Sequence, residues 1–401
     1  MAWNWAWKRP GRKGAPHASS QGDKARETKM TNGFVALHVD KSASWIARDY
    51  STLAREGFMR NPVAHRCVRL IADAASSVPW LLYEGVTEHE THPLLQLLTH
   101  PQAGLDGSSF LERLYGHLLI SGNAYVERVD LPSGRIELHL LKHECVSVET
   151  DGNGWPEALV YRSGSSVRRI RIGSRDATGL HLKLFHPLDD HYGFAPLEAA
   201  LMALDTHNAA GAWNKALLDN SARPSGALVY APKDGGNLTE EQFERLKAEL
   251  EEGYTGASGA GRPLLLEGGL DWKAMGYSPH DMDFMEAKNG AARDIALAFG
   301  VPPMLLGIPG DNTYANYAEA NRAFYRLTVL PLMGRTARAF GNWLGLVFGE
   351  NLRLDYDADR IEGLSAEREA LWRRVSNASF LSDEEKREAV GYQPDRRRMP
   401  S

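Results

Sequence analysis

Cysteine is scarce in this sequence, because its 401 residues include only Cys67 and Cys145. Two cysteines exclude a disulfide framework and a zinc site built from thiolates. Long apolar runs are missing too, and a membrane span needs about 20 unbroken apolar residues. The longest uncharged run, 295–310, is interrupted by Gly300, Pro302, Pro303, Gly307 and Pro309. We therefore expect a soluble chain made in a reducing, intracellular compartment, with no membrane contact.

The sequence also lacks an excess of basic residues. Lys and Arg number 46 against 51 Asp and Glu, which gives a formal charge of −5. Nucleic-acid-binding proteins are normally basic, so any contact with DNA must be local or weak. With 43% hydrophobic and 24% charged residues, the chain can bury a substantial core, and its length suggests about two to three domains.

No catalytic or metal-binding motif is present. The segment 256–261 begins like a phosphate-binding loop, but Arg262 and Pro263 follow where that motif needs Lys and then Ser or Thr. The histidines have no H-E-x-x-H spacing, and neither cysteine lies in a catalytic signature. We predict no enzymatic activity, no metal and no cofactor.

The first half of the chain predicts a mixed α+β region behind a basic arm. Residues 1–30 contain Trp3, Trp5 and Trp7 and have no apolar periodicity, which predicts a disordered arm or, alternatively, one that docks on a neighbouring subunit or on nucleic acid. A helix should begin at Asn61 and Pro62 with Cys67 and Ile71 on its buried face. Shorter helices are expected over 92–99 and 108–120. Strands are expected over 78–83, 123–129, 135–141, 145–150, 158–162 and 179–185.

The second half predicts long helices around a small module. A helix starting at Pro196 should run to about residue 221, roughly 40 Å, and a second should occupy 279–299. Between them a β-α-β-β module is expected, with strands at 226–230, 263–266 and 270–277. Its helix should begin with a capping box between Thr239 and Gln242. A loop over 306–316 precedes a helix from about residue 315 to 348 that Pro331 should kink. A strand at 352–356 and helices near 365–375 and 382–390 end the chain.

Several segments in this order resemble the portal proteins of HK97-type phages, including those of phage-like gene transfer agents. The resemblance is carried by Cys67-Val-Arg-Leu-Ile-Ala-Asp-Ala, Val78-Pro-Trp80, His92-Pro-Leu-Leu, Gly122-Asn-Ala-Tyr-Val126, Gly193-Phe-Ala-Pro-Leu197, Asn220-Ser-Ala-Arg-Pro-Ser-Gly226, Leu265-Leu-Glu-Gly268, Gly300-Val-Pro-Pro-Met-Leu-Leu-Gly307, Tyr325-Arg and Leu330-Pro331. It covers about residues 50–350.

The resemblance implies a portal fold and a homo-oligomeric ring, usually of twelve subunits, at one vertex of a virion or virus-like particle made in the bacterial cytoplasm. Double-stranded DNA would be packaged and ejected through the ring, which would contact the major capsid protein, the terminase large subunit and then a head–tail adaptor. The implied parts are an α/β wing (31–195), two stem helices (196–222 and 279–299), a clip (223–278), a tunnel loop region (300–318), a long kinked helix with a closing wing strand (315–360) and a short helical crown with tail (361–401).

Two sets of functional residues follow from this assignment. The tunnel loop should touch DNA through Asp311, Asn312, Thr313, Tyr314 and Asn316. The clip helix should dock the packaging motor and the adaptor through Glu240, Glu241, Glu244, Arg245, Glu251 and Glu252. The clip has six basic and nine acidic residues, which suits a conduit that does not grip DNA. The alternatives are another structural component, such as a minor head protein, and a nucleotide-binding enzyme.

Overall fold

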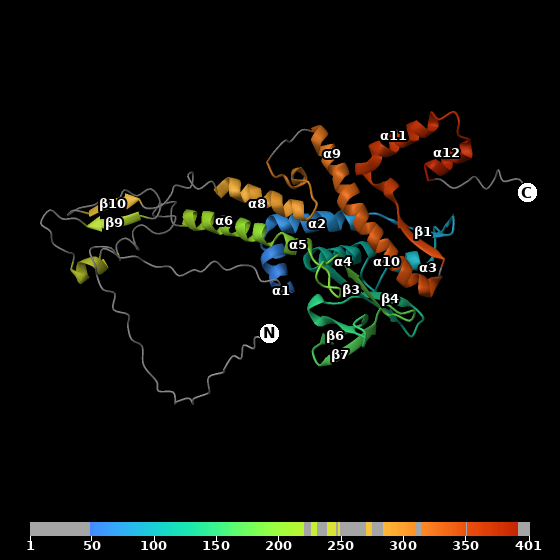
Figure 1. The fold of residues 1–401 in the computed structure, drawn as a ribbon, viewed down its shortest axis with the longest axis horizontal. Helices are drawn as coiled ribbons and strands as arrows, with labels where there is room; N and C mark the ends of the chain where they lie inside the picture. Colours follow the sequence, from blue (N-terminus) through green and yellow to red (C-terminus); the bar gives the residue numbers. More distant parts are fainter. Residues whose placement is uncertain are drawn as a thin grey trace, which may run out of the picture.

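The computed structural model describes residues 49–219, 226–230, 239–245, 248, 270–274, 284–309, 314–349 and 351–391. Helices and small antiparallel sheets alternate in this part of the chain, so the predicted mixed helix-and-sheet class is confirmed. The molecule is elongated (Figure 1). A strand pair lies at one end, two helices run side by side from it to a larger body, and two short helices lie beyond the body. These elements are β9 (Gly226–Tyr230), β10 (Leu270–Ala274), α6 (Leu201–Asp219), α8 (Phe284–Ala298), α11 (Ser365–Ser376) and α12 (Asp383–Ala389).

Three helices form the centre of the body. They are α2 (Pro62–Ser76), α4 (Gly107–Ser121) and α10 (Leu330–Phe348). As predicted, α2 begins where Asn61 caps it, and the Asn61 Oδ1 accepts hydrogen bonds from the Val63 and Ala64 amides at 3.0 and 3.1 Å. Cys67 and Ile71 are fully buried. The large side chains of the core lie between these helices, and they include Leu114, Tyr115 and Phe340.

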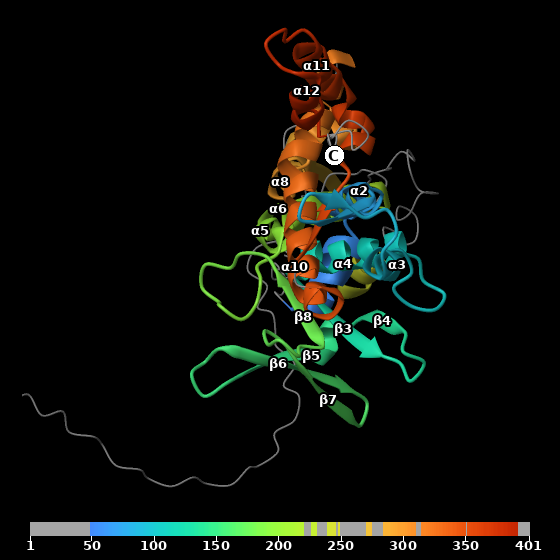
Figure 2. The ribbon, with the colours of Figure 1, turned by 90° about the vertical axis from the view of Figure 1, so that its right-hand side faces the viewer.

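Small antiparallel sheets cover the helical centre. Their orders in the described chain are β11-β1-β2, β4-β3-β8 and β5-β6-β7. The strands are β1 (Trp80–Glu84), β2 (Thr87–Glu88), β3 (Asn123–Asp130), β4 (Ile136–Leu140), β5 (Val146–Thr150), β6 (Pro156–Ser163), β7 (Ser166–Arg171), β8 (Gly179–Lys183) and β11 (Leu352–Tyr356). The strand predicted at 352–356 pairs with β1, with Leu82 opposite Leu354. The β5-β6-β7 sheet lies at the bottom of the view in Figure 2, at one side of the body. It has its own small core of Tyr125, Leu141, Leu159, Ile170 and Ile172.

Three elements of the body were not predicted. They are the helical segment α1 (Tyr50–Thr52) with the π-helical turn η1 (Leu53–Met59), strand β2 and strand β7. Strand β7 has one buried side chain, Ile170, among exposed neighbours, so it lacks the alternation that marks a strand in a sequence. Backbone pairing with β6 holds it, and Arg169 adds ion pairs to Glu149 and Glu157 of neighbouring strands.

The single helix predicted from Pro196 to residue 221 was wrong in its continuity. A four-residue helix, α5 (Pro196–Ala199), ends at Ala200, and α6 begins at Leu201. Ala200 has ψ near 0°, so the chain turns there without a glycine or proline to announce it. Leu197 and Leu204 are buried, whereas Trp213, further along α6, is 47% exposed.

Strand β10, within the strand predicted at 270–277, pairs with β9 in the described residues. Trp272 lies opposite Leu228 in this pair. Residues 263–266 lie outside the described residues, as does the predicted start of the second long helix at 279. The predicted capping box is confirmed, since Thr239 and Gln242 exchange backbone-to-side-chain hydrogen bonds at 3.0 and 3.3 Å.

The long C-terminal helix is interrupted where the sequence predicts a kink. Helix α9 (Tyr314–Phe324) passes through a π-helical turn, η5 (Tyr325–Val329), into α10. Pro331 follows this turn, and a proline lacks the amide that would continue regular bonding to the preceding turn. Widening the turn before the proline accommodates that loss. None of the described helices is long and apolar enough to span a membrane.

Candidate DNA channel and docking surfaces

A buried polar network joins the base of α6 to the body. The Asn61 side-chain nitrogen, Nδ2, lies 3.2 Å from His207 Nδ1 and donates to Asn208 Oδ1 at 2.9 Å. The Asn208 side chain donates in turn to the Glu56 carbonyl at 3.2 Å. Burial, with repulsion from Lys288 as a smaller cause, lowers the pKa of His207, so this imidazole is neutral at pH 7. The network fixes the direction in which α6 leaves the body.

Two segments that carry the resemblance contact each other directly. Gly122 has φ +74°, and a Cβ on it would lie 2.5 Å from the Gly193 carbonyl carbon. The buried Asn123 side chain bridges the pair by accepting from the Gly193 amide at 2.7 Å and donating to the Gly193 carbonyl at 3.3 Å. The close approach requires glycine at position 122. The contact between Gly122 and Gly193 therefore positions the chain just before it enters α5 and α6.

The turn after α8 positions the next loop. Gly300 adopts φ +66° and its carbonyl accepts from Thr328 Oγ1 at 2.6 Å. A 3-10 turn, η4 (Pro303–Leu306), follows and ends at Gly307 with φ +72°. Ile308 is buried against Ala292 and Ala296 of α8. The prolines and glycines of this segment therefore fold it back onto α8.

The predicted tunnel loop is shorter than expected. The loop was expected over 306–316, but Leu306 belongs to η4 and Ile308 packs on α8. Tyr314 and Asn316 lie in α9, because that helix begins at Tyr314. Asp311, Asn312 and Thr313 lie outside the described residues. Among the five predicted DNA-contacting residues, the structure describes the side chain of Asn316 alone. This side chain is exposed.

Four of the six residues predicted to form a docking surface lie in the described chain. Glu240, Glu241, Glu244 and Arg245 are all exposed on the helical segment 240–245. Glu251 and Glu252 lie outside the described residues. The segment lies with β9 and β10 at the end of the molecule away from the body (Figure 1). Three carboxylates and one guanidinium therefore face solvent on this segment.

Helices α6 and α8 carry little charge. Helix α6 has two acidic residues and one basic residue, and α8 has two of each, so the pair sums to −1. A surface that grips DNA would need clustered Lys and Arg, and neither helix has such a cluster. The pair can line a passage for DNA with little attraction to the phosphates.

The histidines of the described chain form no cluster that could hold a metal ion. No group of three metal-ligating side chains occurs among the residues that the structure describes. His181 Nε2 lies 3.0 Å from Asn123 Oδ1, and the His143 ring stacks on Tyr50 at 4.4 Å between centroids. Burial lowers the pKa of His143 to about 4 and that of His181 to about 3. Both are therefore neutral, partly buried residues at pH 7.

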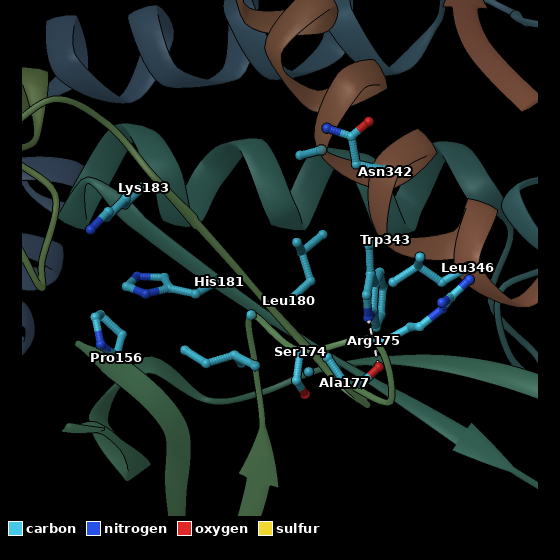
Figure 3. A pocket seen from close by; sticks show the side chains of 14 residues that line it. Pro156, Ser174, Arg175, Ala177, Leu180, His181, Lys183, Asn342, Trp343 and Leu346 are labelled. Carbon is cyan, nitrogen blue, oxygen red and sulfur yellow. Dashed lines mark hydrogen bonds between the residues drawn. The ribbon is translucent and has the colours of Figure 1, made fainter. Parts of the chain in front are cut away.

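A surface pocket of about 650 Å³ escaped the sequence analysis. Figure 3 shows it between the 172–179 loop, β8 and α10, where Trp343 Nε1 donates to the Ala177 carbonyl at 3.1 Å. Its walls come from segments more than 150 residues apart in the chain. No local pattern could have connected them.

Comparisons with known proteins decide the family. The model of the family described as "Phage portal protein" matches residues 62–391. The chain belongs to the phage portal protein family. A protein of Rickettsia bellii is 43% identical over 340 residues, 84% of this chain and 88% of the relative.

Two solved structures contain chains of similar fold. A chain from the structure "Neck of native GTA particle computed with C12 symmetry" is 50% identical, with a TM-score of 0.67, and the match covers 88% of this chain and 95% of that one. An HK97-family phage portal protein from Corynebacterium diphtheriae is 14% identical with a TM-score of 0.57, over 79% of this chain and 99% of that one. The portal resemblance stated from the sequence is therefore confirmed, as is the similarity to gene transfer agent necks.

Proposed function

We propose that this chain is the portal subunit of a phage or gene transfer agent particle. Twelve copies would form a ring at one capsid vertex, and double-stranded DNA would enter and leave through its channel. The observation that carries the proposal is the 50% identity, over 88% of the chain, to a protein in a neck with twelvefold symmetry.

The surface of the two stem helices supports a ring. Met202 on α6, and Met285 and Leu297 on α8, are 74%, 62% and 77% exposed in the single chain. Large apolar side chains on a solvated helix pair are typical of surfaces that another protein covers. Packing of the same helix pair around an axis would cover them in every subunit.

Native mass spectrometry of the purified protein tests the ring. We expect a single assembly at twelve times the mass of the 44.4 kDa chain. A monomer at every protein and salt concentration, with no rings in negative-stain images, would overturn the proposal.

The parts of the portal follow the assignment made from the sequence. Residues 31–195 with β11 would be the wing, 196–222 and 279–299 the stem, 223–278 the clip and 361–401 the crown. Two features of the structure support this division. The β9–β10 pair lies beyond α6 and α8, and β11 adds to the sheet that begins with β1.

The tunnel loop would be the narrowest part of the channel. Its core is residues 309–313, between the anchored Ile308 and the start of α9. Replacing 311–313 with Gly and Ser leaves α9 intact, so ring assembly should be unchanged while DNA packaging or retention falls. The same replacement in the β5–β6 turn, residues 151–153, is the control. Particles of the 311–313 variant with wild-type DNA content would reduce the loop to a connector.

The clip helix would dock the terminase large subunit and then the head–tail adaptor. Its exposed carboxylates offer polar contacts that exchange readily between partners. The double variant Glu240→Lys, Glu244→Lys should weaken motor binding and leave the ring intact. Glu384→Lys, on α12 far from the clip, is the control. Equal motor binding by the two variants would reject this surface.

The portal would act without catalysis of its own. The segment 256–261 lacks the Lys and Ser or Thr of a nucleotide-binding loop. A titration of the purified protein with fluorescent ATP should show no saturable binding, and a saturable curve would restore the nucleotide-binding alternative.

A further inference from the structure

Two different surfaces on opposite sides of α10 carry opposite charges and exposed apolar side chains. One is a projecting hairpin tip and the other is the pocket of Figure 3. We propose that, in the ring, the hairpin tip of each subunit inserts into this pocket of the next subunit. The inference rests on the proposed function, because it names a contact that closes the ring.

The projecting surface is the tip between β1 and β2. Glu84 pairs with Thr87 across a two-residue turn of Gly85 and Val86. The Val86 side chain is 89% exposed, and Gly85 has the positive φ of +62° that a tight turn needs. Glu84 and Glu88 flank the valine. Glu84 lies 3.2 Å from His89 Nε2, so it is held in position beside the tip.

The receiving surface is apolar at its floor and cationic at its edge. Trp343, Leu346 and Leu180 contribute apolar surface, and Leu346 is 42% exposed. Arg175 and Lys183 line the same pocket, and no carboxylate does. A volume of about 650 Å³ lies in the range of ligand pockets, roughly 300–1,000 Å³. The pocket therefore has room for a whole hairpin turn and not only for a single side chain.

The hairpin and the pocket lie on opposite sides of one helix. The pocket takes Ala339, Trp343 and Leu346 from α10, which share a helix face because their spacing is i, i+4, i+7. Gly341 faces Leu354 of β11, and the sheet of β11 continues through β1 to the hairpin. At 3.6 residues per turn, Gly341 lies roughly 150° around the helix from the pocket face.

Both surfaces also lie at the same end of α10. Helix α10 ends at Phe348, and Leu352, which pairs with Glu84 of the hairpin, follows soon after in the chain. Leu346, which lines the pocket, is in the last turn of the same helix. A ring is built from head-to-tail contacts in which two different surfaces of each subunit meet. The hairpin tip on one side of α10 and the pocket on the other, both near the C-terminal end of the helix, satisfy that requirement.

The chemistry favours a second copy of this chain as the occupant. Val86 would lie on the apolar floor, while Glu84 and Glu88 would face Arg175 and Lys183. Ion pairs at such an edge contribute little energy but fix the orientation of the partners. The valine would supply most of the affinity through the apolar surface that it buries.

Two single substitutions test the contact from its two sides. Val86→Asp replaces the apolar side chain of the tip with a carboxylate, and Leu346→Asp places a charge on the apolar floor of the pocket. Burial of one valine corresponds to about a tenfold change in affinity, so each variant should need about ten times more protein to assemble. Val167→Asp, which changes an exposed valine on β7, is the control. Assembly of Val86→Asp at the wild-type concentration would overturn the proposal and indicate another occupant for the pocket.

Mixing the two variants separates this contact from a general defect. The Leu346→Asp subunit keeps its hairpin, and the Val86→Asp subunit keeps its pocket. Native mass spectrometry should therefore show more mixed dimers than dimers of either variant alone. Equal amounts of the three dimers would contradict the proposed pairing.

A disulfide test covers the case in which the charged variants fold poorly. The double variant Val86→Cys, Leu346→Cys in a Cys145→Ser background leaves Cys67, which is buried with its pKa raised to about 12 and is unreactive. Oxidation should give a ladder of linked subunits on a denaturing gel. Wild-type rings with no ladder in the variant would overturn the contact alone, whereas absence of rings in the wild type would overturn the proposed function.

Discussion

Replacement of Asn123 by alanine should be the most costly polar substitution in the body of the molecule. The Asn123 side chain is buried and makes contacts in four directions. Its Oδ1 lies 2.7 Å from the Gly193 amide and 3.0 Å from His181 Nε2. Its Nδ2 donates to the Ser121 carbonyl at 2.7 Å and to the Gly193 carbonyl at 3.3 Å. The variant leaves all four partner groups without this side chain, and those on Gly193 and Ser121 are buried.

The magnitude follows from these contacts. A buried polar group that loses its partner costs about 1–3 kcal/mol, and a typical net hydrogen bond contributes about 1 kcal/mol. Four losses, partly relieved by water, give a destabilisation of about 3–5 kcal/mol. At about 2 °C per kcal/mol for a large domain, the melting temperature should fall by about 6–10 °C.

Thermal unfolding at one fixed protein concentration measures this effect. Asn377→Ala is the matched control, because Asn377 is exposed, and it should change the melting temperature by less than about 1 °C. A fall of less than about 2 °C for Asn123→Ala would refute the reasoning. It would mean that the Gly122–Gly193 junction does not depend on this side chain.

Further predictions concern pH and packing. Burial lowers the pKa of His143 to about 4, below the 6.5 of an unfolded histidine. The unfolded chain therefore binds more protons below pH 6.5, and the urea midpoint should fall between pH 6.5 and 4. His143→Phe should flatten that fall and exposed His100→Phe should not. Gly122→Ala should cost at least about 2 kcal/mol in urea unfolding, because the left-handed backbone and the contact with residue 193 both oppose it. Gly134→Ala, with open space around it, should cost only about 1 kcal/mol. Phe340→Ala, in the centre of the core, should cost about 3–5 kcal/mol.

Much of the local structure could be predicted because its causes lie within a few residues. Asn61 and Pro62 start α2, and Thr239 and Gln242 form a capping box, because a cap acts over one helical turn. The position of the interruption before Pro331 was predictable for the same reason. The order of short motifs from Cys67 to Pro331 was enough to indicate the portal family, which the comparisons confirm.

The sequence could not reveal features whose causes are distant or weak. The break at Ala200 and strand β7 lack a local signal, because the first has neither glycine nor proline and the second has no alternation. The predicted tunnel loop was too long, because its composition does not show that Ile308 packs on α8.

What the sequence alone determined is where elements begin and which family the chain joins, since capping, turn chemistry and motif order are short-range properties. Only the tertiary structure decided which segments meet. It brings Asn61 to His207, Gly122 to Gly193, and Trp343 to the Ala177 carbonyl. Each of these contacts closes a loop of 70 residues or more, and many chain segments could bury the same apolar area. The selection among them depends on backbone approach and hydrogen-bond geometry in three dimensions, which a one-dimensional pattern does not contain.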